Sequence, residues 1–162
     1  NLPPWRGGGE MIREVKKESV TFADSPSRFE AGTPNIIQAV GLGAAIDYFH
    51  SKVKLGLFDY EKKIAQYFHN EIQAVNKVKV YGKENLSSPM ISFTVDGAHP
   101  HDIAAIIDRE GVAIRAGHHC TQPLMSFFNL NSTARASIGM YTDKNDINLF
   151  IKALDKAITF FD

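Results

Sequence analysis

The chain has 162 residues, a length that suits one domain or one domain with a flanking segment. Hydrophobic residues make up 44% and charged residues 22%, the mixture of a globular protein with a sizeable core. The 18 basic and 18 acidic side chains balance, so nothing favours nucleic acid, which needs a basic face. No stretch approaches about 18 consecutive apolar residues, so we expect no membrane-spanning segment.

Two further features of the sequence indicate the cellular environment of the chain and whether it is complete. Cys120 is the single cysteine, which rules out an internal disulfide and favours a reducing, cytoplasmic environment. The sequence begins at Asn1 with Leu-Pro-Pro-Trp and a run of glycines, without an initiator methionine or a signal peptide. We therefore expect a piece of a longer protein that begins inside a loop.

The first part of the chain is expected to contain loops and two helices. Residues 1–32 are loop-rich, with an alternating stretch around Val20 that suits a short strand. Thr33, followed by proline, gives the start of a helix that runs to about His50. This helix is apolar on most sides, so we expect it to be buried between two bodies. Apolar residues repeat every three or four positions over residues 57–75, which predicts a second helix.

The rest of the chain alternates strands and helices. The order strand, strand, helix, strand, strand, helix predicts an α+β domain, with helices on one face of a small, mostly antiparallel sheet. The expected elements are strands at 78–81 and 90–95, a helix at 100–110 stopped by Gly111, a strand at 112–116, a loop at 117–121, a helical turn at 123–128, a strand at 134–138 and a helix capped by Thr142 or Asp143.

The most informative motif is Arg-Ala-Gly-His-His-Cys at residues 115–120. A strand delivers an arginine, a glycine permits a sharp turn, and two imidazoles precede the thiol. The thiolate is the nucleophile of cysteine chemistry, and cationic groups favour it. Arg115, His118 and His119 are therefore candidates for activating Cys120. An unreactive loop cysteine beside two surface histidines explains the same pattern.

A zinc site is another interpretation of these residues. His99, His101, His118 and His119 could join Cys120 around a tetrahedral ion. However, the adjacent side chains of His118 and His119 point apart, and the chain has no second cysteine. We therefore expect no metal.

Two further positions suggest the binding of anions. Arg135 lies inside an expected strand between small residues, and a buried arginine needs an anionic partner such as a carboxylate. An internal ion pair explains Arg135 equally well. Gly32 and Thr33 come directly before a helix, where free amides bind phosphate, although plain helix capping gives the same pattern.

Four motifs together carry a family resemblance. They are Pro-Pro-Trp-Arg-Gly-Gly-Gly at 3–9, Arg-Phe-Glu-Ala-Gly-Thr-Pro-Asn at 28–35, Arg-Ala-Gly-His-His-Cys at 115–120 and Arg-Ala-Ser at 135–137. In sequence and spacing they resemble group II (SufS-like) cysteine desulfurases, which are fold-type-I enzymes that depend on pyridoxal phosphate (PLP). The resemblance covers essentially the whole chain. Thr121 stands where many members have alanine, a departure that we expect to be harmless.

The resemblance implies roles for particular residues. Cys120 is expected to attack the sulfur of L-cysteine and become a persulfide, leaving L-alanine. Arg135 is expected to hold the substrate carboxylate, with Arg115 nearby. Thr33 is expected to reach the PLP phosphate of the other subunit of a homodimer. The sulfur is expected to pass to a SufE-like or SufU-like acceptor for iron–sulfur cluster assembly.

The resemblance also implies that the chain is incomplete, because family members are more than twice as long. The Schiff-base lysine that binds PLP is expected before Asn1, so the chain by itself is expected to be inactive. Residues 1–77 are expected to be a connector and a remnant of the large PLP-binding domain, with a long linking helix. Residues 78–162 are expected to be the small C-terminal domain that carries the cysteine loop.

Two rival functions stay open at this point. Selenocysteine lyase is a close alternative, because SufS-like proteins blur the distinction between sulfur and selenium substrates. A non-enzymatic module that binds a partner and uses Cys120 as a redox thiol is a distant one, because local motifs persist on folds that have changed function.

Overall fold

The structure is a computed structural model of the chain, and it describes residues 2–82 and 89–161. The chain divides into two compact units, Asn1–Ser51 and Lys52–Asp162. Within the described residues, no helix combines the length and the apolar character that crossing a bilayer requires. The loop predicted between the first two strands of the α+β domain falls largely outside the described residues.

The first unit contains a hairpin and most of a long helix. Strand β1 (Ile12–Val15) pairs antiparallel with β2 (Val20–Phe22), and a 3-10 turn, η1 (Ser27–Phe29), follows. Helix α1 (Ile36–Lys54) then begins and continues past the boundary of the unit. The short strand predicted around Val20 is confirmed, and β1 is the partner that the sequence did not predict.

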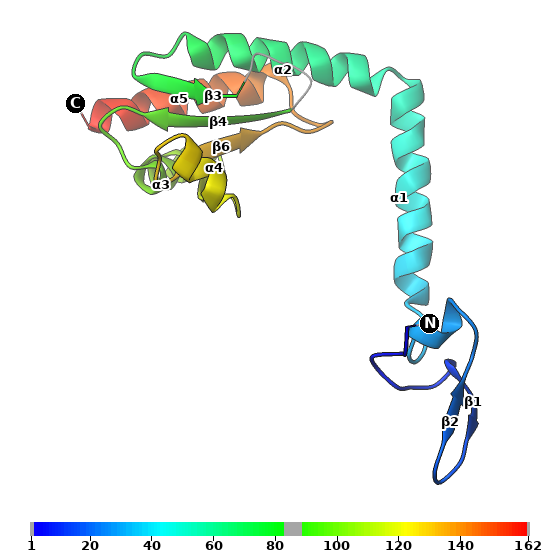
Figure 1. Ribbon diagram of the computed structural model, residues 1–162. Coiled ribbons are helices and arrows are strands. Elements are labelled where there is room, and N and C mark those ends of the chain that lie inside the picture. Colours follow the sequence, from blue (N-terminus) through cyan, green and yellow to red (C-terminus); the bar gives the residue numbers. More distant parts are fainter. Residues whose placement is uncertain (1, 83–88, 162) are drawn as a thin grey trace. The chain divides into compact units, whose positions relative to one another are not determined.

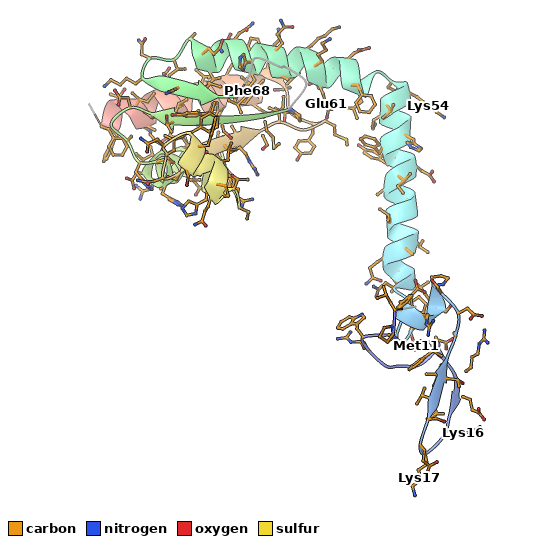
Figure 2. All side chains as sticks on the ribbon, in the orientation of Figure 1. Met11, Lys16, Lys17, Lys54, Glu61 and Phe68 are labelled. Carbon is orange, nitrogen blue, oxygen red and sulfur yellow. The ribbon has the colours of Figure 1, made fainter. Side chains whose placement is uncertain are left out.

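Met11 is the one buried side chain among the described residues of this unit. Figure 2 shows it near one end of the hairpin, with Lys16 and Lys17 at the other end. The predicted long helix is confirmed as α1, but none of its 19 residues is buried. We expected this helix to be buried between two bodies. The first unit does not bury it, because a two-stranded hairpin is too small to cover such a helix.

The second unit is the predicted α+β domain (Figure 1). Its elements are α2 (Leu57–Gln73), β3 (Val78–Tyr81), β4 (Met90–Val95), α3 (Pro100–Arg109), β5 (Arg115–Gly117), α4 (Gln122–Phe127), β6 (Thr133–Ser137) and α5 (Lys144–Phe160). The strands form one antiparallel sheet in the order β3–β4–β6–β5. Helix α2 packs against β3 and α5, and α3 packs against α5 and the other three strands.

The alternation of side chains along β4 decides which face of the sheet is buried. Ile91 and Phe93 belong to the core, whereas Ser92 between them points to the opposite face. Phe150 of α5 packs edge to face on Phe68 of α2, with ring centroids 5.3 Å apart, and on Phe93 at 6.0 Å. Phe68 is labelled in Figure 2. The three helices therefore cover one face of the sheet, and the site residues lie on the opposite face.

Strand β5 departs from the prediction. The strand expected at 112–116 begins at Arg115, because Val112 and Ile114 pack against the core without entering the ladder. Gly111 stops the preceding helix as predicted, with a left-handed φ of +84°. Asp143 caps α5 as predicted, since its carboxylate accepts hydrogen bonds from two amides of the first turn.

The position of α2 bears on the predicted domain boundary between residues 77 and 78. This helix packs against β3 and α5, so the contacts group it with the second unit. The division into a connector at 1–77 and a small domain at 78–162 concerns the longer protein, and it stays a prediction.

Candidate functional site

A row of polar side chains crosses the face of the sheet that lies opposite α2, α3 and α5. Tyr81, Ser92, Arg135 and Arg115 are consecutive cross-strand partners, one from each strand. Directly opposed residues of an antiparallel pair project to the same face, with Cβ atoms about 4.5–5.5 Å apart. Arg115 and Arg135 are thus neighbours, and two like charges so placed repel each other unless an anion lies with them.

The chain turns sharply after β5. Gly117 has a φ of +133°, and His119 and Cys120 have φ values of +56° and +59°. The left-handed region costs a residue with a β-carbon about 1 kcal/mol or more. Thr121 closes the turn, because its amide and its hydroxyl donate to the carbonyl oxygen of His118 at 3.0 and 2.7 Å.

Cys120 is exposed on this turn, between β5 and β6, and it lies beside an arginine. Nη2 of Arg115 donates to Sγ of Cys120 at 3.8 Å. A guanidinium is the kind of cationic donor that suits a thiolate. The arrangement therefore fits a nucleophilic cysteine better than a buried structural one.

His119 is held from the sheet side of the turn. Its Nε2 lies 3.0 Å from the carbonyl oxygen and 2.9 Å from the hydroxyl oxygen of Thr133. Because a carbonyl only accepts, the proton of the neutral ring is assigned to Nε2. Burial lowers the pKa of His119, and the charges of Arg135 and Arg115 lower it further, against the opposing effect of the Thr133 carbonyl. The ring is therefore neutral at neutral pH.

The turn and β5 line a pocket of about 460 Å³ that is open to solvent. This volume lies in the range that small-molecule sites occupy. Arg115 belongs to the lining and Arg135 does not. The Nε atom of Arg135 is buried and has no hydrogen-bond partner among the described residues. The lining consists of residues 115–120 together with Gln122 and Pro123.

The structure brings most of the predicted site residues together. Arg115, His118, His119, Cys120 and Arg135 all lie on or beside the turn after β5. Thr33 lies in the first unit and is exposed, three residues before Ile36, where α1 begins. In the described ranges 2–82 and 89–161, no three His, Cys, Asp or Glu side chains converge as a metal site requires.

Comparison with known proteins decides the family. Residues 1–150 match the family model of class-V aminotransferases. The chain belongs to this family. A probable cysteine desulfurase of Staphylococcus aureus (strain Mu50) is 43% identical over 161 residues, which are 99% of this chain and 39% of that protein.

Two solved structures of cysteine desulfurases have the same fold over nearly the whole chain. The cysteine desulfurase CsdA of Escherichia coli superposes with a TM-score of 0.88 at 28% identity, over 99% of this chain and 40% of that one. A cysteine desulfurase of Thermococcus onnurineus NA1 gives 0.85 at 35% identity, over 98% and 40%. The predicted resemblance to cysteine desulfurases is confirmed, and the chain spans about 40% of the length of these relatives.

Two threonines that the sequence did not predict as site residues form hydrogen bonds within the site. Thr133 binds His119 and is only 1% exposed. Thr121 stands where we expected a harmless replacement of alanine, and its hydroxyl binds the carbonyl of His118. The signal for Thr133 was its polar side chain two positions before Arg135 in a strand, since a buried hydroxyl needs a partner. Which partner it takes depends on the fold.

Proposed function

We propose that this chain is the cysteine-bearing part of a longer, PLP-dependent cysteine desulfurase that transfers sulfur from L-cysteine to Cys120. The observation that carries the proposal is the exposed thiol of Cys120, which Arg115 contacts at 3.8 Å in an open pocket. The names of the relatives favour the same activity over a redox module.

The paired arginines suit the substrate carboxylate. A guanidinium binds a carboxylate through two parallel hydrogen bonds, and Arg135 lies beside Arg115 on the same face of the sheet. Arg115 lies directly opposite on β5 and would add a second positive charge. A bound carboxylate would also relieve the repulsion between the two guanidinium groups.

Cys120 would act as the nucleophile. Its thiolate attacks the sulfur of the substrate, so that an S–S bond forms while the substrate's C–S bond breaks. The electron pair of the C–S bond stays with the substrate carbon, which takes up a proton to give L-alanine, and a persulfide is left on Cys120. PLP, when bound, supplies the electron sink for this cleavage.

The residues of the first unit that would meet PLP fit a phosphate group. Thr33 is exposed three residues before α1, near a helix N-terminus, where a hydroxyl and free amides favour an anion. By the family resemblance, Thr33 would serve the PLP of the other subunit in a homodimer. The Schiff-base lysine would come from a part of the longer protein that this chain does not contain.

An acceptor protein, SufE-like or SufU-like, would collect the sulfur for iron–sulfur cluster assembly in the cytoplasm. The turn that carries Cys120 is short and is closed by Thr121, which limits how far the persulfide can swing. Helix α4 follows at once and exposes Leu124 and Phe127, the latter by 80%. A docked acceptor would cover these apolar side chains beside the thiol.

Replacing the nucleophile in the full-length protein tests this function. Cys120→Ser should abolish the formation of alanine from L-cysteine while the absorbance of bound PLP remains, because only the nucleophile is lost. Ser126→Ala, an exposed change on α4, is the matched control and should keep normal turnover. Normal turnover in Cys120→Ser would refute the proposal. A parallel assay with selenocysteine tells desulfurase from selenocysteine lyase.

A second variant tests the carboxylate site. Arg135→Ala should raise the KM for L-cysteine by about tenfold to a hundredfold, because a hydrogen-bonded charge contact contributes about 1.5–3 kcal/mol. Arg135→Lys keeps the positive charge but lacks the planar guanidinium, so its KM for L-cysteine should lie between those of the parent and Arg135→Ala. An unchanged KM in Arg135→Ala would remove Arg135 from substrate binding.

A further inference from the structure

The position of the Cys120 sulfur depends on a strained turn. His119 and Cys120 both lie in the left-handed region, with φ values of +56° and +59°. Residues with a β-carbon avoid this region, and two in succession persist only where surrounding contacts hold them. The contacts that hold the turn therefore determine whether Sγ of Cys120 meets Arg115.

One such contact joins the turn to the sheet. Nε2 of His119 lies 3.0 Å from the carbonyl oxygen and 2.9 Å from the hydroxyl oxygen of Thr133. A single N–H that is shared between two acceptors of one residue fixes both the tautomer and the orientation of the ring. The other ring nitrogen, Nδ1, is buried and has no partner among the described residues. Thr133 is therefore the contact by which the ring of His119 is held.

Thr133 is a rigid anchor. It is 1% exposed and begins β6, an inner strand between β4 and β5. It pairs with Gly117, the last residue of β5, and it precedes Arg135 by two positions on the same strand face. The ring of His119 thus ties the turn of Cys120 to the strand that carries the proposed carboxylate ligand.

The charge state of His119 supports this arrangement. Burial is the largest cause that lowers its pKa, and Arg135, Arg115 and His118 lower it further. A neutral ring has one N–H, and the Thr133 carbonyl directs it to Nε2. The ring therefore acts as a fixed neutral donor.

We propose that Thr133 is a positioning residue for Cys120: its hydroxyl and carbonyl hold the ring of His119, and the ring holds Cys120 in the left-handed turn beside Arg115. This rests on the proposed function of Cys120 as the nucleophile and adds a residue that acts through His119. Thr133 itself touches neither substrate nor cofactor in this scheme.

Alkylation of Cys120 by iodoacetamide measures the positioning directly, because it needs no desulfurase turnover. In the full-length protein, mass spectrometry of the peptide that contains Cys120 gives the rate at neutral pH. Thr133→Val keeps the shape and the carbonyl but removes the hydroxyl, and it should slow alkylation about threefold to tenfold, the range for one lost hydrogen bond. Thr133→Ser restores a hydroxyl and should stay close to the parent rate.

A matched control separates positioning from a general loss of stability. Thr142→Val removes a hydroxyl that accepts a hydrogen bond from the amide of Gly139, outside the pocket lining. It should leave the alkylation rate of Cys120 unchanged. If Thr133→Val does not fold, Thr133→Ala takes its place in the comparison with Thr133→Ser. Parent-like alkylation in the variant without the hydroxyl, or an equal loss in Thr133→Ser, would overturn the proposal.

Steady-state kinetics give an independent readout. Thr133→Val should lower kcat and leave the KM for L-cysteine unchanged, because Arg115 and Arg135 remain in place. A raised KM at constant kcat would assign Thr133 to substrate binding and refute the positioning role. If the parent protein shows no desulfurase turnover, the proposed function fails. The alkylation rates of Cys120 still test the positioning role of Thr133 in that case.

Discussion

The two units of the chain differ in how many of their side chains are buried in a core. The second unit packs three helices against one face of its sheet, and Phe68, Phe93 and Phe150 meet in its core. The first unit buries Met11 alone among its described residues, and Ile37 on α1 is 84% exposed. Local signals are enough to specify a hairpin and a helix in both units. Among the described residues, a core that immobilises the strands is present only in the second unit.

The same contrast separates the proposed site residues. The strained turn of Cys120 follows β5, which pairs with β6, and the opposite face of β6 packs in the core. The residues around Cys120 are therefore fixed in space. Thr33 lies in the unit without such a core. A catalytic constellation needs positions fixed within a fraction of an ångström, which rigid elements provide. We therefore expect this chain to order the proposed nucleophile, Cys120, unaided and to leave the proposed phosphate contact of Thr33 to the longer protein.

The largest expected effect comes from opening the core of the second unit. Phe150→Ala removes the ring between Phe68 and Phe93, and it should cost about 3–5 kcal/mol of unfolding free energy. Urea unfolding followed by circular dichroism measures it on the chain itself. Ile37→Ala on α1 is the control and should change stability by about 0.5 kcal/mol or less, because this side chain is exposed. Equal losses in the two variants would abolish the contrast between the units.

A smaller effect is expected from the single buried side chain of the first unit. Met11→Ala should cost about 2 kcal/mol, the low end for a buried methionine, since the hairpin offers few neighbours. Hydrogen exchange should show faster exchange in β1 and β2, while the amides of α5 keep their protection. Equal loss of protection in α5 would show that the units unfold together.

The smallest effect concerns the pH dependence of the second unit. His119 has a lowered pKa, chiefly because of burial, so the native state binds its proton less readily than the unfolded state. Its contribution to stability is complete above the unfolded pKa of about 6.5 and is lost as the pH falls through the lowered folded value. Urea midpoints should therefore fall more steeply below about pH 6.5 in the parent than in His119→Gln. Parallel curves would contradict the lowered pKa.

Much of the second unit follows from the sequence alone. Strands β3 and β4 lie where alternation and β-branched residues predict them, and Gly111 and Asp143 end and begin helices as their chemistry requires. The motif around Cys120, through its family resemblance, predicts a nucleophile there without any structure, and that role stays a prediction. These features are local, because a period of two or of 3.6 residues and a capping side chain act within a few positions.

Only the tertiary structure decided which residues meet. The ladder register sets Arg115 opposite Arg135 and Thr133 opposite Gly117, and Thr133 meets Nε2 of His119. The tertiary structure also decides that β5 begins at Arg115, although the alternation of apolar residues that predicted this strand begins at Val112. Cross-strand register joins positions far apart in the chain, and it is fixed by packing the whole sheet against its helices. A shift of one residue would turn Arg135 into the core, and no local pattern in the sequence carries that information.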